Sequence, residues 1–468
     1  MLVMQSLRHI SLILLFLLAL IFIPVIFAGY ADLHFAEAAS AAHDRSLYYE
    51  SAARRLLWRV DFYEMAGSAA LEAGEYKRAI TLFKTARLKS VLTSYGQFQL
   101  GQAYFFDKNE AQALAEWEGL SDGDALAAAS PYLADAYHAQ ARFDDEKQVL
   151  RRWLSLDPQN ADAHYRMGLL LFADASPDAI PLLEFASANS PELKPSADGL
   201  RVSLKTALED ASVAGALTSC GQTLAAMTEW PLALKTFSHA TQIDSNNALA
   251  WAWLAETRQH ITGSGDALVA FQRAIKLSPA SAQIHAMMGL YWQRQNDWQQ
   301  AHLEYAEAAR LEPDNAIWQI SLGDVDVHLG NLVTALAYYH RAVAVAPRNA
   351  QAWRALALFS VENDADVEDT GRNAALRAYS LEPDNVQNID VLGRALMLTK
   401  QYDAAEVLFR KALTLSPQAA APAYHLGLLY LQTNQGILAK EYFQLAQKLD
   451  PIGSIGEQAG KILARYFP

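Results

Sequence analysis

From about residue 60 onward, hydrophobic and polar residues follow a pattern that repeats about every 34 residues. Within each repeat, apolar and small residues recur at spacings of three and four, which is typical of one face of an α-helix. Two such stretches fall in each repeat, with a few polar residues between them. The pattern therefore predicts pairs of amphipathic helices joined by tight turns, and an all-α protein.

Regularly spaced prolines mark the period. Successive prolines lie 34, 34, 36, 34 and 34 residues apart, at Pro279, Pro313, Pro347, Pro383, Pro417 and Pro451. Proline lacks an N–H and clashes with the preceding helical turn. Each of these prolines is therefore expected to stop the second helix of a pair.

Other positions keep the same period when each proline is numbered 32 in its unit. Position 8 is glycine (Gly289, Gly323, Gly393, Gly427), position 20 is alanine (Ala267, Ala301, Ala335, Ala405, Ala439), position 24 is aromatic (Phe271, Tyr305, Tyr339, Phe409, Phe443) and position 27 is alanine (Ala274, Ala308, Ala342, Ala412, Ala446). Small residues let two helix backbones approach closely, where a larger side chain would wedge them apart. We expect the aromatic to fill the space between neighbouring pairs. Position 15 (Asn296, Gly330, Asn434) suits a left-handed residue that closes a helix.

This unit resembles the tetratricopeptide repeat in its period and in its Leu-Gly-x-x-Tyr, Ala-x-x-x-Phe-x-x-Ala and Pro positions. A well-formed example carries Leu426, Gly427, Tyr430, Ala439, Phe443, Ala446 and Pro451. The resemblance extends over about eleven units between residues 60 and 453. It implies a right-handed superhelical solenoid, because a single helix pair cannot cover its own apolar faces and must stack on its neighbours.

Segments that depart from the period set the predicted domain boundaries. Residues 194–213 do not fit it, yet Leu200, Leu204 and Leu208 suggest an extra helix. The predicted order is a membrane segment (1–31), a linker with an N-terminal capping helix (32–59), a first repeat block (60–193), the extra helix (194–213), a second block (214–453) and a C-terminal capping helix (454–468). In the unit from residue 350, a two-residue acidic insertion precedes a degraded second helix.

The N-terminus has a different composition. Residues 10–28 form a 19-residue run without a charge. About 20 apolar residues cross a ~30 Å hydrocarbon core, and this run exceeds the apolar stretch usual in cleaved signal peptides. We predict a single-pass signal-anchor. Small residues around Ala31 leave cleavage and secretion as the alternative.

Flanking charges favour one orientation of that anchor. Arg8 and His9 precede the apolar run, whereas Asp32 and Glu37 follow it. By the positive-inside rule, the N-terminus is expected in the cytoplasm and the repeats outside it.

Charge and cysteine content narrow the possible partners. The formal net charge is −13, and the sequence has no stretch rich in Lys and Arg. Nucleic acid is therefore not an expected partner, because binding it requires a basic surface. Cys220 is the one cysteine, which excludes an intrachain disulfide and a Cys-based zinc motif. We expect it to pack in the core.

Catalytic signatures do not occur in the sequence, which contains no P-loop, Rossmann fingerprint, HExxH or Gly-x-Ser-x-Gly motif. We therefore predict no enzyme activity, no cofactor, no metal and no small-molecule substrate. One alternative of another class is a metal-dependent enzyme that uses Asp324 and His328, which are spaced i, i+4. Asp326, at a position that normally holds an aromatic, needs a polar partner or water, and we expect either local loosening or a polar contact with the neighbouring unit.

The family resemblance implies a binding groove instead. In this family the first helices of the pairs line the concave side of the solenoid. The candidate groove residues are Tyr165, Leu169, Phe172, Glu256, His260, Leu290, Gln293, Arg294, Asp324, His328, Arg354, Arg394, Tyr424 and Leu428. This mixture of apolar and charged residues suits an extended peptide or a partner helix. The Lys/Asn/Arg clamp by which some members hold a C-terminal carboxylate has no match on three adjacent units.

The sequence therefore predicts a membrane-tethered scaffold that binds partner proteins or peptides and supports complex assembly. A more specific alternative is an accessory or assembly factor for the export of cell-envelope polysaccharide, lipid or protein. The sequence does not identify the partner, because the same fold serves unrelated functions.

Overall fold

A computed structural model describes residues 2–121, 123–209, 212–261, 263 and 266–468, with side chains described at residue 16 and from residue 20 onward. Over these residues the chain forms 26 α-helices, one short π-helix and no β-strand. The chain divides into two compact units, Met1–Ile243 (unit 1) and Asp244–Pro468 (unit 2). The predicted all-α class is confirmed.

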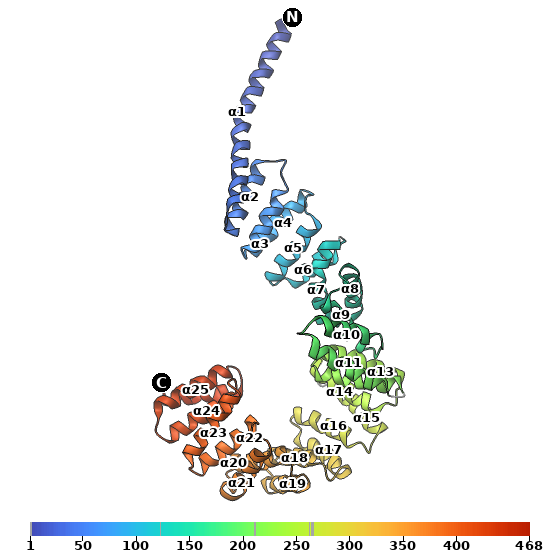
Figure 1. Ribbon diagram of the computed structural model, residues 1–468, viewed down its shortest axis with the longest axis vertical. Helices are drawn as coiled ribbons and strands as arrows, with labels where there is room; N and C mark the ends of the chain where they lie inside the picture. Colours follow the sequence, from blue (N-terminus) through green and yellow to red (C-terminus); the bar gives the residue numbers. More distant parts are fainter. Residues whose placement is uncertain (1, 122, 210–211, 262, 264–265) are drawn as a thin grey trace. The chain divides into compact units, whose positions relative to one another are not determined.

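Eleven helix pairs are present among the described residues, as the period predicted (Figure 1). Unit 1 contains α3–α4 (Phe62–Glu72, Tyr76–Leu88), α5–α6 (Ser94–Phe106, Glu110–Glu118), α7–α8 (Gly123–Ala139, Phe143–Leu156), α9–α10 (Ala161–Phe172, Ala179–Asn189) and α12–α13 (Val213–Ala226, Trp230–Ile243). Unit 2 contains α14–α15 (Ala248–Ile261, Ala267–Leu277), α16–α17 (Ala282–Arg294, Trp298–Leu311), α18–α19 (Ala316–His328, Leu332–Val345), α20–α21 (Ala350–Glu362, Arg372–Leu381), α22–α23 (Val386–Leu398, Tyr402–Leu415) and α24–α25 (Ala420–Gln432, Gly436–Leu449).

The glycine at position 8 lies directly under the aromatic ring at position 24 of the same pair. A Cβ atom added to Gly393 would lie 2.6 Å from Cε1 of Phe409, and one added to Gly427 would lie 2.7 Å from the ring of Phe443. Both distances are shorter than van der Waals contact, so even a methyl group would force the two helices of a pair apart. The alanines at positions 20 and 27 are completely buried in the same contact.

The position-24 ring also reaches the next pair. The ring of Tyr339 lies 5.4 Å from that of Phe359, and the ring of Phe271 lies 5.7 Å from that of Tyr291, centroid to centroid. Each aromatic therefore fills the space inside its own pair as well as the expected space between pairs.

Turns within the pairs use a left-handed residue at position 15. Asn296, Gly330 and Asn434 have φ values of 58°, 78° and 60°, as their position in the repeat predicted. Lys400 adopts the same conformation at φ 61°. The turn geometry therefore persists even where the residue is not one that favours it.

Each repeat boundary stops one helix and starts the next. Helix α19 ends at Val345, two residues before Pro347, and Asn349 then accepts a hydrogen bond from the backbone N–H of Ala352 at 3.2 Å. Asn385 caps α22 in the same way after Pro383. Proline ends the second helix and the asparagine side chain satisfies a free N–H of the following one.

The insertion in the unit from residue 350 forms a π-helical turn, η1 (Val367–Gly371), which runs directly into a short α21. Asp364 and Asp366 take left-handed conformations in front of it. Ala374, Ala375 and Ala378 remain buried on the same face. The two added residues are therefore absorbed before the helix, and the packing face of the pair is preserved.

In unit 1 an unpaired helix, α11 (Lys194–Leu208), stands between α10 and α12 and buries Leu200 and Leu204. After it, α13 contacts segments more than 60 residues earlier in the chain. Lys235 binds Asp174 at 2.9 Å, and the Thr236 hydroxyl donates to the carbonyl oxygen of Ala173 at 2.9 Å. In an unbroken solenoid each repeat touches only its neighbours, so these contacts are additional cross-links.

A histidine makes a second long-range link in unit 1. His138, at the end of α7, lies 3.0 Å from Glu146 through Nδ1 and 3.0 Å from Glu229 through Nε2. Glu146 is buried, and Glu229 is 91 residues away from His138 in the sequence. Hydrogen bonds to these two carboxylates raise the pKa of His138 to about 10, against the opposing effect of burial.

The chain begins with one long helix, α1 (Leu2–Ala38), along whose C-terminal end α2 (Ala42–Arg55) packs in the antiparallel direction. Asp32 pairs with Arg55, and a Cβ atom on Gly29 would meet the side chain of Leu56 at 2.6 Å. Residues 32–38, which the sequence assigned to a linker, thus continue the helix. At the other end, α26 (Ser454–Tyr466) follows the last pair and packs on α25.

Among the described residues, one helix is long and apolar enough to cross a membrane, over Leu20–Ala38. Most side chains of the predicted span 10–28 before Leu20, and those of Arg8 and His9, lie outside the described residues. Helix α1 is thus compatible with an anchor or a signal segment.

Replacing Gly393 with alanine is expected to destabilise the protein by about 2 kcal/mol, because the methyl group overlaps the ring of Phe409. Gly199, in the middle of α11, is the matched control, since a Cβ atom there has no neighbour within 4 Å. Gly199→Ala should raise stability by about 0.5–1 kcal/mol through helix propensity. Urea unfolding measures both changes, and equal effects at the two positions would contradict the packing described here.

Replacing His138 with glutamine is expected to cost about 2 kcal/mol where His138 is charged. The folded-state pKa lies above the ordinary value of 6.5, so the stabilisation is fully present below pH 6.5 and is lost as the pH rises toward about 10. The difference in unfolding free energy between wild type and variant should therefore shrink over that range. A difference that stays constant with pH would show that the charge on His138 contributes nothing.

Candidate protein-binding groove

The predicted groove residues of unit 2 all lie on the first helices of their pairs. Glu256 and His260 belong to α14, and Leu290, Gln293 and Arg294 to α16; Asp324 and His328 belong to α18, Arg354 to α20, Arg394 to α22, and Tyr424 and Leu428 to α24. Residues of one first helix can therefore contact residues at similar repeat positions of the first helix in the next pair.

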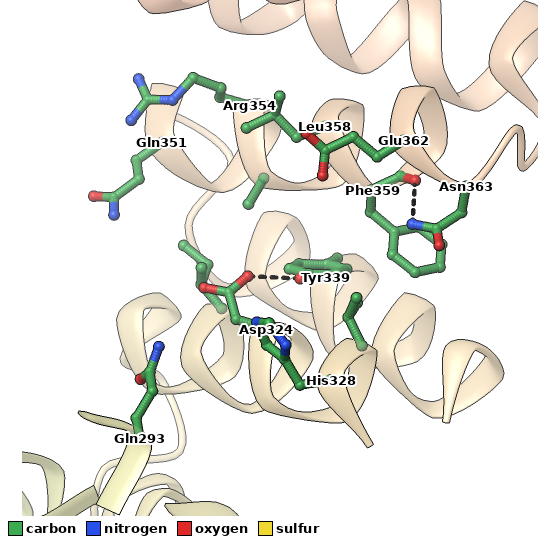
Figure 2. Close-up of a pocket in the computed structure, with 13 residues that line it drawn as sticks. Gln293, Asp324, His328, Tyr339, Gln351, Arg354, Leu358, Phe359, Glu362 and Asn363 are labelled. Atoms are coloured by element: carbon green, nitrogen blue, oxygen red, sulfur yellow. Dashed lines mark hydrogen bonds between the residues drawn. The ribbon is translucent and has the colours of Figure 1, made fainter. Parts of the chain in front are cut away.

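Four of these residues, Gln293, Asp324, His328 and Arg354, line a pocket of about 380 Å³ (Figure 2). Apolar side chains from α18 and α20 form part of its wall: Ile320, Val327, Ala355, Leu358 and Phe359. Polar groups also line it, among them Gln351, Glu362 and Asn363. The pocket therefore combines an apolar surface with two carboxylates.

Asp324 lies at the centre of the pocket and is accessible to water. Its carboxylate accepts a hydrogen bond of 2.6 Å from the hydroxyl of Tyr339. Partial burial in the pocket raises the pKa of Asp324, and the negative charge of Glu362 adds to that shift, while the hydrogen bond from Tyr339 and the nearby His328 oppose it. A negative charge on Asp324 is thus only partly compensated by its surroundings.

The two basic groups near Asp324 have other contacts. The imidazole of His328 stacks on the ring of Trp298 with centroids 3.8 Å apart and planes 8° apart. The Arg354 guanidinium donates to Oδ1 of Asn388 at 2.9 Å, on the side of α20 toward α22. Among the described residues no group of three or more His, Cys, Asp or Glu side chains is placed to hold a metal ion.

Asp326, two residues further on α18, is buried and points away from the pocket. Its Oδ1 lies 3.2 Å from Nδ1 of His302 on α17. The two groups are close enough for an ion pair when His302 is protonated, but their geometry does not form a hydrogen bond. Asn331 donates to the same oxygen at 3.4 Å. The expected polar contact with the neighbouring unit is therefore present.

A second cluster joins α14 to α16. Arg294 binds Glu256 with both terminal nitrogens, at 2.8 and 2.9 Å. Gln259 and His260 also contact Glu256, at 3.1 and 3.3 Å. Glu256 is largely buried by these partners, so this part of the predicted groove is already occupied by a bridge between adjacent repeats.

The remaining predicted residues of unit 2 are only partly accessible. Arg394 donates to Glu362 at 3.3 Å and so brings a positive charge to the pocket rim. Tyr424 and Leu428 pack against the C-terminal core beside Phe443. Leu290 is half-buried on α16.

Two of the predicted groove residues of unit 1 are buried in the structure. Phe172 is completely buried and Leu169 is 6% exposed, so neither can touch a partner at a groove surface. Helix α11 packs on α9, and Thr236 of α13 donates to the carbonyl oxygen of Ala173, the residue after the end of α9. Tyr165, also on α9, remains half-buried.

The sequence analysis did not predict an aromatic pocket that is present in unit 1. It has a volume of about 380 Å³ and is lined by Phe105, Glu110, Trp117, Tyr132, Asp135, Ala136, Ala139 and Gln140. Phe105 is at position 12 of its unit, and Asp135 and Ala139 are at positions 9 and 13; the predicted groove residues Leu290, Gln293 and Arg294 occupy positions 9, 12 and 13 of theirs. The positions of these residues in the repeat could therefore have predicted the pocket from the sequence.

Comparison with known families identifies the repeat. Residues 286–344, 389–418 and 421–452 match tetratricopeptide repeat families. The chain contains tetratricopeptide repeats. The matched residues form α17, α18, α23 and α25 and most of α16, α19, α22 and α24, where the position-8 glycines and position-24 aromatics are best preserved.

Two curated proteins are similar over part of the chain. The BBSome complex member bbs-4 of Caenorhabditis elegans is 23% identical over 228 residues, 47% of this chain and 49% of that protein. Cellulose synthase 2 operon protein C of Komagataeibacter xylinus is 34% identical over 138 residues, 29% of this chain and 10% of that protein. The matches thus span about half of one relative and a tenth of the other.

Solved structures also align with the chain. A chain of the APC/C hetero-tetramer Cut9–Hcn1 aligns with a TM-score of 0.42 and 17% identity, over 97% of this chain and 98% of its own. Yeast Tom70 aligns with a TM-score of 0.43 and 17% identity, over 95% of each chain.

The Glu256–Arg294 bridge is expected to couple adjacent repeats. A double-mutant cycle with Glu256→Gln and Arg294→Gln should give a coupling energy of about 1 kcal/mol or more, because the pair is bidentate and its carboxylate is buried. The exposed pair Glu307–Arg310 within α17 is the control and should give a much smaller coupling energy, because solvent screens it. Urea unfolding of the single and double variants measures both, and equal coupling energies would contradict a structural role for the bridge.

Proposed function

We propose that this protein is a membrane-tethered scaffold that binds partner proteins or peptides along the first helices of unit 2. The observation that carries the proposal is the pocket between α18 and α20, where apolar walls adjoin the carboxylates of Asp324 and Glu362. Tetratricopeptide repeats are protein-binding modules, and this pocket lies at the positions expected for their ligands.

The chemistry of the pocket favours an extended peptide that carries a lysine or arginine. Asp324 has a hydroxyl partner and a nearby His328 but keeps a raised pKa, so an incoming cation would stabilise a charge that is only partly compensated. The aliphatic stem of such a side chain would pack on Ile320 and Leu358 while its charged end meets the carboxylates. Arg394 competes for Glu362, which leaves Asp324 as the main charged contact.

The membrane tether belongs to the same proposal. Helix α1 supplies an apolar segment long enough to span a bilayer, and the charges that flank it favour repeats on the extracytoplasmic side. If the segment is instead removed as a signal peptide, the repeats would be secreted and the groove would keep the same role.

A second candidate function is an accessory or assembly role in export of cell-envelope polysaccharide, lipid or protein. The similarity to cellulose synthase 2 operon protein C over 138 residues supports it. In this role the groove would hold a component of a membrane-bound enzyme or transporter.

The proposal includes no catalysis. Asp324 and His328, the residues considered for a metal, are held by Tyr339 and Trp298 respectively. The contacts of both residues suit positioning of a bound peptide.

Site-specific photo-crosslinking of the full-length protein in its native membranes tests the groove. A photoreactive residue at Gln351, on the pocket wall, should give an adduct with a discrete partner. The same residue at Val333, which is 86% exposed on the second helix α19, is the control and should not. Asp324→Asn together with Glu362→Gln should lower the adduct yield about ten-fold, equivalent to about 1.4 kcal/mol.

Two results would refute this assignment. One is the same adduct from Gln351 and Val333. The other is an adduct from Gln351 whose yield the double substitution leaves unchanged, although urea unfolding shows that the variant is folded.

A further inference from the structure

An exposed apolar turn follows α2. The backbone N–H of Arg59 donates to the carbonyl oxygen of Leu56 at 2.8 Å, and this bond closes a turn whose two central residues are Leu57 and Trp58. Leu57 is 70% exposed and Trp58 is 56% exposed, whereas their neighbours Leu56 and Phe62 are buried. A leucine and a tryptophan at the tip of one turn are unusual exposed neighbours, and their position relative to α1 suggests a role.

Because α2 packs antiparallel on α1, the turn that follows α2 lies beside a defined part of α1. The ring of Tyr48 meets that of Phe35 at 5.6 Å, and Leu56, further along α2, lies against Gly29, further back along α1. The turn therefore lies level with residues 26–29, at the C-terminal end of the uncharged run 10–28. Phe27 and Tyr30 are exposed on α1 near the same level.

Charged residues on α2 show how far a bilayer could extend along α1. Helix α2 runs beside residues 26–38 and carries Asp44, Arg45, Glu50, Arg54 and Arg55. These charges belong in water, because placing them in hydrocarbon is costly. If α1 spans a membrane, the boundary between hydrocarbon and water thus lies close to Gly29, at the level of the turn.

The arginines around the turn are already paired. Arg54 pairs with Glu50, Arg55 with Asp32, and Arg59 with Asp61 at 2.8 Å. Formal charges of the three pairs cancel, so the surface around Leu57 and Trp58 attracts anionic lipid no more than zwitterionic lipid.

We propose that Leu57 and Trp58, with Phe27 and Tyr30 of α1, form an interfacial belt that inserts into the headgroup region of the bilayer spanned by α1. This inference rests on the membrane tether proposed above. Tryptophan and tyrosine favour this region, because their rings are apolar and their N–H or O–H group reaches water. The belt holds the first repeats at the membrane surface, since α1 packs on α2 and α2 packs on α3, the first helix of the first pair (Figure 1).

Fluorescent labels on the full-length protein in lipid vesicles test the belt. Cys220 is buried and its burial raises the thiol pKa to about 12, so an introduced exposed cysteine takes the label selectively. Labels are placed by Leu57→Cys in the turn, by Phe22→Cys in α1 and by Leu88→Cys as the control, where an apolar side chain is 86% exposed at the end of α4. Brominated phosphatidylcholine quenches a label that lies in the bilayer.

The expected result is strong quenching at position 22, several-fold stronger quenching at 57 than at 88, and the same quenching at 57 when phosphatidylglycerol is mixed in. A label at 57 that is quenched no more than the one at 88, while position 22 is quenched, overturns the belt alone. Absence of quenching at 22 overturns both the tether and the belt. Quenching at 57 that requires phosphatidylglycerol overturns insertion driven by the apolar side chains. Wild-type protein treated with the same reagent shows that Cys220 stays unlabelled.

Discussion

The contact between an aromatic ring and a bare glycine backbone sets the geometry of the best-preserved repeats. Gly393 under Phe409 and Gly427 under Phe443 bring two helices together at a distance that no other residue permits. The same ring then meets the first helix of the next pair, as Tyr339 meets Phe359. One side chain therefore defines both the closeness of a pair and its contact with the neighbour, so core packing and stacking are a single interaction repeated along the chain.

Because of this constraint, the first helices of adjacent pairs lie side by side. Their polar residues can therefore form contacts between one repeat and the next. In unit 2, Arg294 satisfies Glu256, and Arg354 satisfies Asn388. Asp324 accepts a hydrogen bond from the Tyr339 hydroxyl, and at this point an apolar pocket opens. The pocket lies where α20 gives way to the inserted π-turn, since Glu362 and Asn363 are among its lining residues. The proposed binding pocket thus lies where pairing between repeats is incomplete.

Unit 1 uses the same repeats with added constraints. The unpaired helix α11 allows α13 to reach back to Asp174, and Glu229 to reach His138. At the N-terminus, α1 enters the packing through Gly29 and Asp32 without a flexible joint. A protein held by its first helix would therefore transmit the position of that helix to the first repeats, as a scaffold at a membrane surface requires.

The sequence by itself determined the helix pairs, their number, the left-handed turn residues and the close approach at the glycines. These features depend on spacings within a single 34-residue unit, which local sequence records directly. Tertiary structure alone decided which residues of the first helices are accessible: Phe172 and Leu169 are buried, whereas Phe105 and Tyr132 line a pocket. It also decided the partners of His138 and the level of Trp58 beside α1. Each of these depends on residues far apart in sequence, and no periodic pattern specifies which distant side chain will cover or pair with a given one.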